Sequence, residues 1–319
     1  MPLHLPASIT VVDVGPRDGL QSFPRAVDTE TKVKMIDRLS DTGLPVIEVT
    51  GFAHPRVIPN LADAERVCER IKRKPGVVYR ALVPNARGAE RAIPAKLDEL
   101  LGLITVSAAY QKKNQNMTLE QGVAEAIATF RVAEKAGVKF VMALGMSMWC
   151  AYEGKIPAET VLSILGQFHN AGMRRFYLAG SLGMEDPHQV SELFGRALAK
   201  FPDIEVGFHV HNLAGTGTAN VLAAIDAGAA FVEGAICGIG GGIAMPKTIA
   251  SVGNLATEDI VHMLNEMGVR TGVETAEIAA AARDIAQLLG IEAGSHTAHV
   301  GTRADVMAGA QKAPREHPA

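Results

Sequence analysis

Residues 132–144, with the sequence VAEKAGVKFVMAL, decide the fold of this chain. They join the end of an amphipathic helix to Gly137, and Gly137 to a short apolar segment. Because glycine adopts a positive φ at little cost, a helix can end there and the chain can turn directly into a strand. A helix followed at once by a buried strand indicates a parallel β-α-β unit.

The same unit occurs three more times, as DRLSDTGLPVIEVT, FHNAGMRRFYLAG and AIDAGAAFVEGAI. With the remaining apolar segments it predicts eight strands, at 9–13, 46–50, 78–82, 103–106, 140–144, 175–179, 205–209 and 231–236. Their spacing of roughly 25–40 residues is typical of a (β/α)8 barrel. A doubly wound open sheet uses the same units, but no GxGxxG follows the first strand. We therefore predict an α/β fold, a (β/α)8 TIM barrel with additional C-terminal helices.

The chain divides into three expected parts. Residues 1–253 form the barrel core. Residues 254–293 form C-terminal helices packed on the barrel, and Thr257 followed by Glu258 and Asp259 is a plausible helix start. Residues 294–319 are small and polar, and we expect them to be a flexible tail.

The composition excludes several classes of function. A net charge of −3 over 319 residues argues against binding of nucleic acid or an anionic membrane surface. No apolar stretch approaches the roughly 20 residues that span a bilayer. Three separated cysteines without a CxxC pair predict neither structural zinc nor disulfides. The first residues lack a signal-peptide pattern, so we expect a cytoplasmic protein.

Polar residues gather where the predicted strands end, which is where barrel enzymes place their chemistry. They are Arg17, Asp18 and Gln21 after the first strand, Glu48 on the second, His209, His211 and Asn212 at the seventh, and Asn254, Glu258 and Asp259 after the eighth. His209 and His211 are two residues apart on a strand, so both point to the same face. An isolated pair of this kind is more often structural, but this one lies at a strand end opposite Asp18.

These residues predict a metal site. The expected ligands are Asp18, His209, His211 and the amide oxygen of Asn254. Nitrogen and oxygen ligands without a thiolate favour Mg²⁺ or Mn²⁺ over zinc. The planar fork of Arg17 suits a carboxylate or an enolate oxygen, and a structural ion pair with Glu48 is the alternative, although both can hold. The glycines of GIGGGI, residues 238–243, lack a P-loop ending and indicate a flexible lid or a loop of close approach.

Six segments resemble 3-hydroxy-3-methylglutaryl-CoA lyases. They are DVGPRDGLQ, VIEVTGF, KKNQN, AYEGK, HVHN and GNLATEDIVHML, and the likeness runs from about residue 12 to about residue 273. The resemblance implies a divalent-metal-dependent retro-aldol cleavage of a 3-hydroxyacyl-CoA, with metal ligands at the four positions named above. It implies catalytic roles for Arg17, which stabilises the enolate, and for Glu48, which orients Arg17. His209, Glu258 and Asp259 complete the expected catalytic set. The expected substrate-binding residues are Gln21, Ser107, Tyr152, Gly241 and Gly242.

Three departures from this family pattern concern one end of the barrel. A loop cysteine of the GLGGCP pattern is replaced by Gly242. A GDT triplet after the sixth strand appears as Ala179-Gly180-Ser181, and an SE pair after the fourth strand appears as Ser107-Ala108. Cys237 could substitute for the missing thiol, but a buried small residue on a strand is the preferred interpretation.

Two other functions stay open at this point. A condensing enzyme of the same superfamily would run aldol or Claisen chemistry, and a non-catalytic paralogue would bind metal and acyl-CoA without turnover. The resemblance further implies an acyl-CoA substrate and a homodimer.

Overall fold

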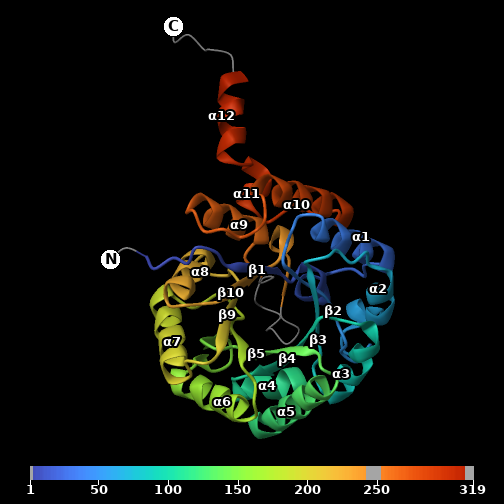
Figure 1. Cartoon of the computed structure of the whole chain (residues 1–319), viewed down its shortest axis with the longest axis vertical. Helices are drawn as coiled ribbons and strands as arrows, with labels where there is room; N and C mark the ends of the chain where they lie inside the picture. Colours follow the sequence, from blue (N-terminus) through green and yellow to red (C-terminus); the bar gives the residue numbers. More distant parts are fainter. Residues whose placement is uncertain (1–2, 242–252, 313–319) are drawn as a thin grey trace.

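The computed structural model describes residues 3–241 and 253–312. Eight parallel strands close into a barrel in the order β1-β10-β9-β8-β5-β4-β3-β2 (Figure 1). Their bounds are β1 Thr10–Asp13, β2 Val46–Gly51, β3 Val78–Leu82, β4 Glu99–Thr105, β5 Lys139–Gly145, β8 Arg175–Gly180, β9 Glu205–Val210 and β10 Phe231–Gly234. The predicted (β/α)8 barrel is confirmed.

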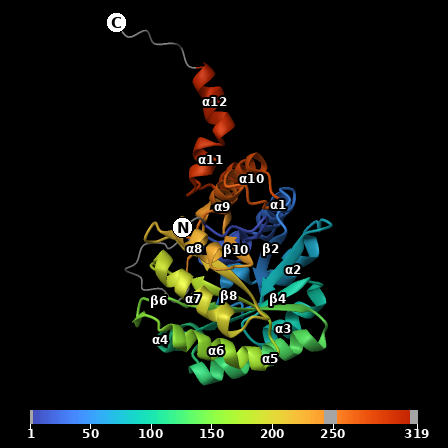
Figure 2. The same cartoon turned by 60° about the vertical axis from the view of Figure 1, so that its left-hand side comes forward.

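Helices form a ring around the barrel (Figures 1 and 2). They are α1 Thr29–Ser40, α2 Ala64–Arg70, α3 Ala86–Ala92, α4 Ala108–Gln115, α5 Leu119–Lys135, α6 Ala158–Asn170, α7 Pro187–Lys200 and α8 Gly217–Asp226. Gly137, which decided the prediction, has φ +68° directly after α5. A glycine therefore ends this helix and lets the next strand begin two residues later.

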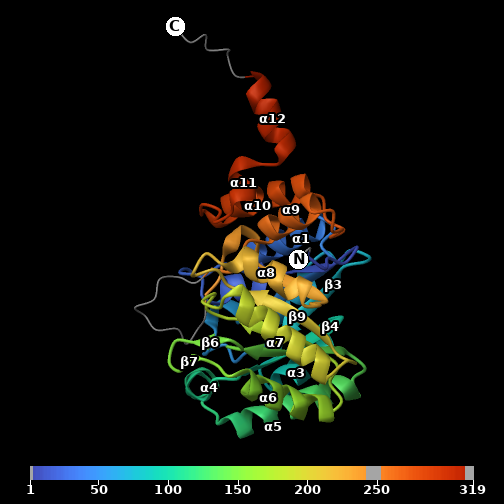
Figure 3. The same cartoon turned by 90° about the vertical axis from the view of Figure 1, so that its left-hand side faces the viewer.

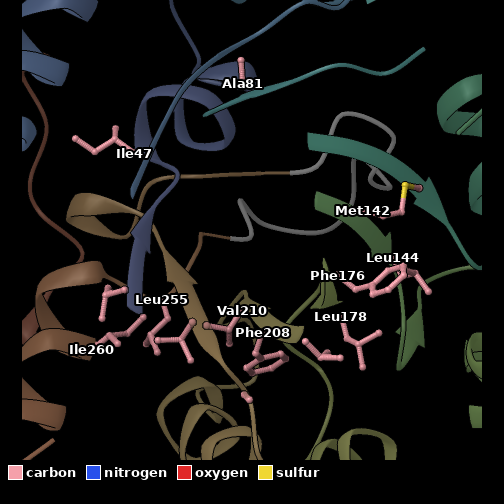
Figure 4. Close-up of a cluster of buried hydrophobic side chains, with 14 of the residues drawn as sticks. Ile47, Ala81, Met142, Leu144, Phe176, Leu178, Phe208, Val210, Leu255 and Ile260 are labelled. Carbon is pink, nitrogen blue, oxygen red and sulfur yellow. The ribbon is translucent and has the colours of Figure 1, made fainter. Parts of the chain in front are cut away.

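The strands bury two separate apolar layers because successive side chains alternate between their faces. On β8, Phe176 and Leu178 join the large cluster between strands and helices, whereas Tyr177 and Ala179 face the barrel interior. Figure 4 labels part of the outer cluster, which also includes Phe208 of β9. Every strand of a closed barrel is buried on both faces, which explains the nearly continuous apolar runs of the sequence.

Three details differ from the sequence prediction. β4 begins at Glu99 and not at residue 103, because its backbone pairs with β3 and β5 from Glu99 onward. β10 ends at Gly234, and Ile236–Gly238 form a short 3-10 helix, η4. A small hairpin of β6 Trp149–Cys150 and β7 Gly154–Lys155 was not predicted.

The C-terminal segment begins on the barrel itself, because Asn254 forms a bridge with His211 and Ala256 with Ala235. Helices α9 Thr257–Glu266 and α10 Thr275–Leu289 then pack on each other, and α10 also packs on α1. The segment expected to be a flexible tail contains α11 His296–Val300 and α12 Arg303–Lys312, and α12 projects away from the body (Figure 3). None of the helices in the described ranges is long and apolar enough to cross a membrane.

Candidate active site

A short π-helical turn, η1 Gly15–Gly19, places Arg17 and Asp18 directly after β1. The carbonyl of Val14 accepts hydrogen bonds from the backbone N–H of Asp18 at 2.7 Å and of Gly19 at 3.3 Å. A side chain at Gly15 would approach Asp13 Oδ1 and Ile236 Cγ2 to 2.9 Å, so the tight turn requires glycine there. Turns of this type are frequent at functional sites.

Asp18, His209 and His211 form one buried group whose potential ligand atoms all lie within 4.8 Å of one another. The two Nε2 atoms of the histidines face each other at 3.1 Å, and His211 Nε2 lies 3.7 Å from Asp18 Oδ2. Asn254 joins the group by donating its amide to Asp18 Oδ2 at 2.8 Å. Asp18, His209 and His211, three of the four predicted ligands, therefore each bring a potential ligand atom to one place, and the fourth, Asn254, contacts Asp18.

The donor set fits a hard divalent cation. Asn254 Oδ1 is buried and has no hydrogen-bond partner within the described part of the chain, as expected for an oxygen reserved for a ligand. Although burial alone raises the pKa of Asp18, Arg17 and the two histidines lower it to about 2, so the carboxylate is ionised at neutral pH. One carboxylate, two imidazoles and an amide oxygen are ligands that divalent cations take in proteins.

Arg17 is held by carboxylates on two sides. Its Nη1 donates to Asp18 Oδ1 at 2.6 Å, and its Nε donates to Glu48 Oε1. Burial alone lowers the pKa of Arg17, but the two carboxylates raise it above its usual value, so the guanidinium stays charged. Glu48 and Asp18 thus hold the Arg17 guanidinium from two sides.

A buried ion chain, Arg17–Glu48–Arg80–Glu233–His209, connects Arg17 to the histidines through the barrel interior. Arg80 donates from Nη2 to Glu48 Oε2 and to Glu233 Oε1, each at 2.6 Å. Glu233 Oε2 in turn lies 3.2 Å from His209 Nδ1. A carboxylate on the far ring nitrogen fixes the ring of a metal-ligating histidine and leaves Nε2 for the metal. His209 can therefore act at Nε2 as a ligand or as a base, but not as both at once.

Sequence reasoning did not identify Arg80 and Glu233. The available signal was a single charge inside an otherwise apolar strand, in VYRAL and in FVEG. Such a charge cannot face solvent when both faces of the strand are covered, so it has to find a partner inside the barrel.

A cavity of about 260 Å³ opens beside the metal group. Arg17, Asp18, Gln21, His209 and His211 line it. Gln21 donates its amide to Asp18 Oδ1 at 2.7 Å and to the Gly241 carbonyl at 3.3 Å. This cavity has room for a small acyl group directly against the metal ligands.

The glycine run approaches the metal group closely. A side chain at Gly240 would overlap the amide of Asn254, whose Nδ2 also donates to the Ile239 carbonyl at 3.0 Å. Ser22 Oγ donates to the Gly241 carbonyl at 2.9 Å. Gly242, the expected substrate-binding glycine and the position of the missing cysteine, lies outside the described residues.

Two predicted site residues on α9 do not line the cavity. The buried Glu258 carboxylate accepts from the backbone N–H of Cys237 at 3.1 and 3.2 Å, and burial raises its pKa to about 8. Asp259 accepts from Ser295 Oγ at 3.0 Å and from the Thr297 N–H at 2.8 Å, at the start of α11. The structure thus places both carboxylates in contacts that hold η4 and α11.

Two other predicted residues lie behind the cavity wall. Ser107 caps α4 by accepting the Tyr110 N–H at 3.1 Å, and its hydroxyl contacts Cys150 Sγ at 3.0 Å. Tyr152 lies at the surface, where its ring centroid is 6.1 Å from that of Tyr110. Tyr110 itself lines the cavity, so it stands between Tyr152 and the site.

The fold and the metal group match one protein family. The HMGL-like family model matches residues 8–285. The chain belongs to the HMGL-like family. A curated relative, hydroxymethylglutaryl-CoA lyase YngG of Bacillus subtilis (strain 168), is 36% identical over 285 residues, covering 89% of this chain and 94% of its own length. The human mitochondrial hydroxymethylglutaryl-CoA lyase is 33% identical over 294 residues, covering 92% and 90%.

Solved structures of this family superpose over nearly the whole chain. The Bacillus subtilis HMG-CoA lyase gives a TM-score of 0.89 at 35% identity and covers 94% of this chain and 99% of its own. An HMG-CoA lyase of Acinetobacter baumannii, solved with coenzyme A and 3-methylmalate, gives 0.86 at 32% identity and covers 98% of each chain. The resemblance predicted from the sequence motifs is confirmed.

Proposed function

We propose that this protein is a divalent-metal-dependent carbon–carbon lyase that cleaves a 3-hydroxyacyl-CoA, HMG-CoA or a related thioester, to an acetyl-CoA-type thioester and a keto acid. The observation that carries the proposal is the buried Asp18–His209–His211 group beside Asn254, at the wall of a cavity that Arg17 also lines. Membership in the HMGL-like family supports it, and so do relatives named as lyases.

In the proposed reaction each residue near the metal group has a defined part. A divalent cation would supply Lewis acidity that lowers the pKa of the substrate's tertiary hydroxyl. A base takes the hydroxyl proton as the keto group forms, the C–C bond breaks, and its electron pair moves into the thioester as an enolate. Arg17 donates a hydrogen bond to the enolate oxygen, which carries the developing charge. Protonation of the enolate carbon by an acid then gives the product thioester. Glu48 keeps Arg17 in place, and Gln21 orders the Asp18 carboxylate.

Mg²⁺ or Mn²⁺ is the proposed cofactor, because the ligand set holds oxygen and imidazole atoms but no thiolate. A coenzyme A thioester is the proposed substrate class, since a structure from Acinetobacter baumannii with 32% sequence identity was solved with coenzyme A. A homodimer and a cytoplasmic location complete the proposal, and light scattering on a sizing column tests the first of these.

The experiment measures acetyl-CoA and keto-acid release from HMG-CoA and a panel of 3-hydroxyacyl-CoAs with Mg²⁺ or Mn²⁺. We expect metal-dependent turnover that disappears in Asp18→Ala, together with loss of Mn²⁺ binding in calorimetry. Asp305→Ala, on the exposed α12, is the matched control and should retain both. A wild-type protein that binds Mn²⁺ but turns over no thioester of the panel would overturn the lyase proposal in favour of a non-catalytic paralogue.

A further inference from the structure

The end of β8 holds a carboxylate that the motifs did not reveal. Glu185 lies in the loop between β8 and α7 and is 2% exposed. Neither oxygen of its carboxylate has a hydrogen-bond partner among residues 3–241 and 253–312. Burial of a carboxylate without donors is costly, and proteins keep such groups mainly where they serve a function. Burial raises the pKa of Glu185 to about 7, although the nearby backbone N–H groups of Glu185 and Met184 lower it in part.

The carboxylate of Glu185 fills the space that a side chain at Gly180 would need. A methylene group placed on Gly180 would lie 2.5 Å from Glu185 Cδ and 3.0 Å from Oε2, and its three nearest heavy atoms all belong to Glu185. Gly180 is not among the glycines with positive φ, so its backbone would accept a side chain. The nearest obstacle to a side chain there is the Glu185 carboxylate.

Gly180 is also the position where the GDT pattern carries its acid. The pattern and this chain therefore differ in the residue that brings the carboxyl group, because the pattern has it at the strand end and this chain has a loop residue whose carboxyl group lies against Gly180. Glu185 is five residues further along the chain, and its longer side chain reaches back to the strand end.

The loop that carries Glu185 is packed against the backbone of a predicted metal ligand. His211 donates its N–H to the Gly180 carbonyl at 3.2 Å, and a side chain at Gly183 would overlap the His211 backbone. The Glu185 carbonyl accepts from Asn220 Nδ2 at 2.9 Å and from Thr216 Oγ1 at 3.1 Å. The loop is thus fixed on both sides, and the carboxylate is held behind the strand ends whose inner faces carry His209 and His211.

We propose that Glu185 is a positioning residue of the metal site, which replaces from the β8–α7 loop the strand-end acid that Gly180 lacks. This inference rests on the proposed function, because the metal site that Glu185 would position is the site of the proposed lyase. Glu185 does not line the cavity, so it acts through the strand ends of β8 and β9 and through its charge, and not by contact with substrate.

A reciprocal exchange tests this proposal. Glu185→Gly removes the carboxylate, Gly180→Asp alone forces two carboxyl groups into one space, and the double variant moves the acid to the strand. We expect each single variant to bind Mn²⁺ about 10–100-fold more weakly, as for other groups that support metal ligands. The double variant should recover affinity to within about threefold of the wild type, a non-additivity expected of groups in contact.

Glu185→Gln separates charge from shape, since it keeps the volume and removes the charge. At pH 8 we expect Glu185→Gln to keep the wild-type melting temperature, to bind Mn²⁺ more weakly and to lower kcat more than it raises KM. Glu192→Gln, on the exposed side of α7, is the matched control and should match the wild type in all three. Wild-type Mn²⁺ affinity in Glu185→Gln, or a double variant no better than the weaker single, would overturn the proposal.

The two proposals can fail separately. Mn²⁺ affinity and melting temperature are measured without any substrate. If the wild type turns over no thioester while the exchange still restores Mn²⁺ affinity, the lyase proposal fails and the role of Glu185 stands.

Discussion

Replacement of Arg80 by methionine should weaken both the fold and the metal site. Arg80 is fully buried and contacts Glu48 and Glu233, each at 2.6 Å, so Arg80→Met leaves buried Glu48 with Arg17 alone and buried Glu233 with His209 alone. Removing one partner of a buried ion pair costs about 3–5 kcal/mol. With an unfolding entropy of about 2.1 cal/mol/K per residue over 319 residues, this lowers the melting temperature by about 4–7 °C.

The metal site should respond at the same time, because the ion chain ends at both sides of it. Glu48 and Glu233 would each lose the Arg80 contact that fixes their orientation, so they would hold Arg17 and His209 less firmly and Mn²⁺ affinity should fall about 10–100-fold. Thermal unfolding without metal and calorimetric titration with Mn²⁺ measure the two effects. Arg196→Met is the control, since its ion pairs lie at the surface and contribute less than about 1 kcal/mol. A melting temperature within about 2 °C of the wild type and unchanged affinity in Arg80→Met would refute the reasoning.

Three further predictions concern the residues beside the site. Burial raises the pKa of Glu258 from 4.5 to about 8, so between these pH values the folded state holds a proton that the unfolded state has lost. The free energy of unfolding therefore falls as the pH rises through this range. Urea unfolding at pH 5 and pH 8 should show this loss in the wild type and not in Glu258→Gln. Asp259→Ala should lower the free energy of unfolding by about 0.5–2 kcal/mol, as loss of a helix cap does, and should leave Mn²⁺ affinity in calorimetry unchanged. Weaker Mn²⁺ binding would place Asp259 at the metal site. Cys237 is buried, its Sγ donates to the Ala282 carbonyl at 3.1 Å, and burial raises the pKa of its thiol. Cys237→Ala should therefore keep the turnover of the wild type. Loss of turnover with intact metal binding would instead make Cys237 the proton donor.

The barrel and the metal group could be predicted because their signals are local. The glycine between helix and strand has a direct conformational cause, and the ligand types stand at the strand ends, as with Asp18 and His211. The ion chain could not be predicted in the same way. Arg80 and Glu233 are separated by 153 positions in the sequence, and only closure of the barrel brings their strands across from each other.

The positions of Glu258 and Asp259 away from the cavity lining have a physical cause as well. Glu258 and Asp259 follow the metal-group residue Asn254 by only four and five positions, which suggested a common site. Helix α9 begins at Thr257, however, and successive side chains on a helix point about 100° apart. Glu258 consequently turns toward η4 and Asp259 toward α11. Glu185 belongs to no motif, because its proposed role depends on its contact with Gly180, where a side chain is absent and only the folded chain brings the two residues together.

The four metal-group residues come from the first and the last parts of the barrel sequence. Asp18 follows the first strand, His209 lies on the seventh with His211 directly after it, and Asn254 comes after the last. A nascent or nicked chain that ends before residue 209 therefore carries a single one of them and cannot bind a cation with any strength. Cation binding then reports that β10 has paired with β1 and the ring is complete. Because ligand that binds only the native state stabilises it by about 2.7 kcal/mol at 100 times Kd, a bound ion would slow the reopening of that seam and protect it from proteases.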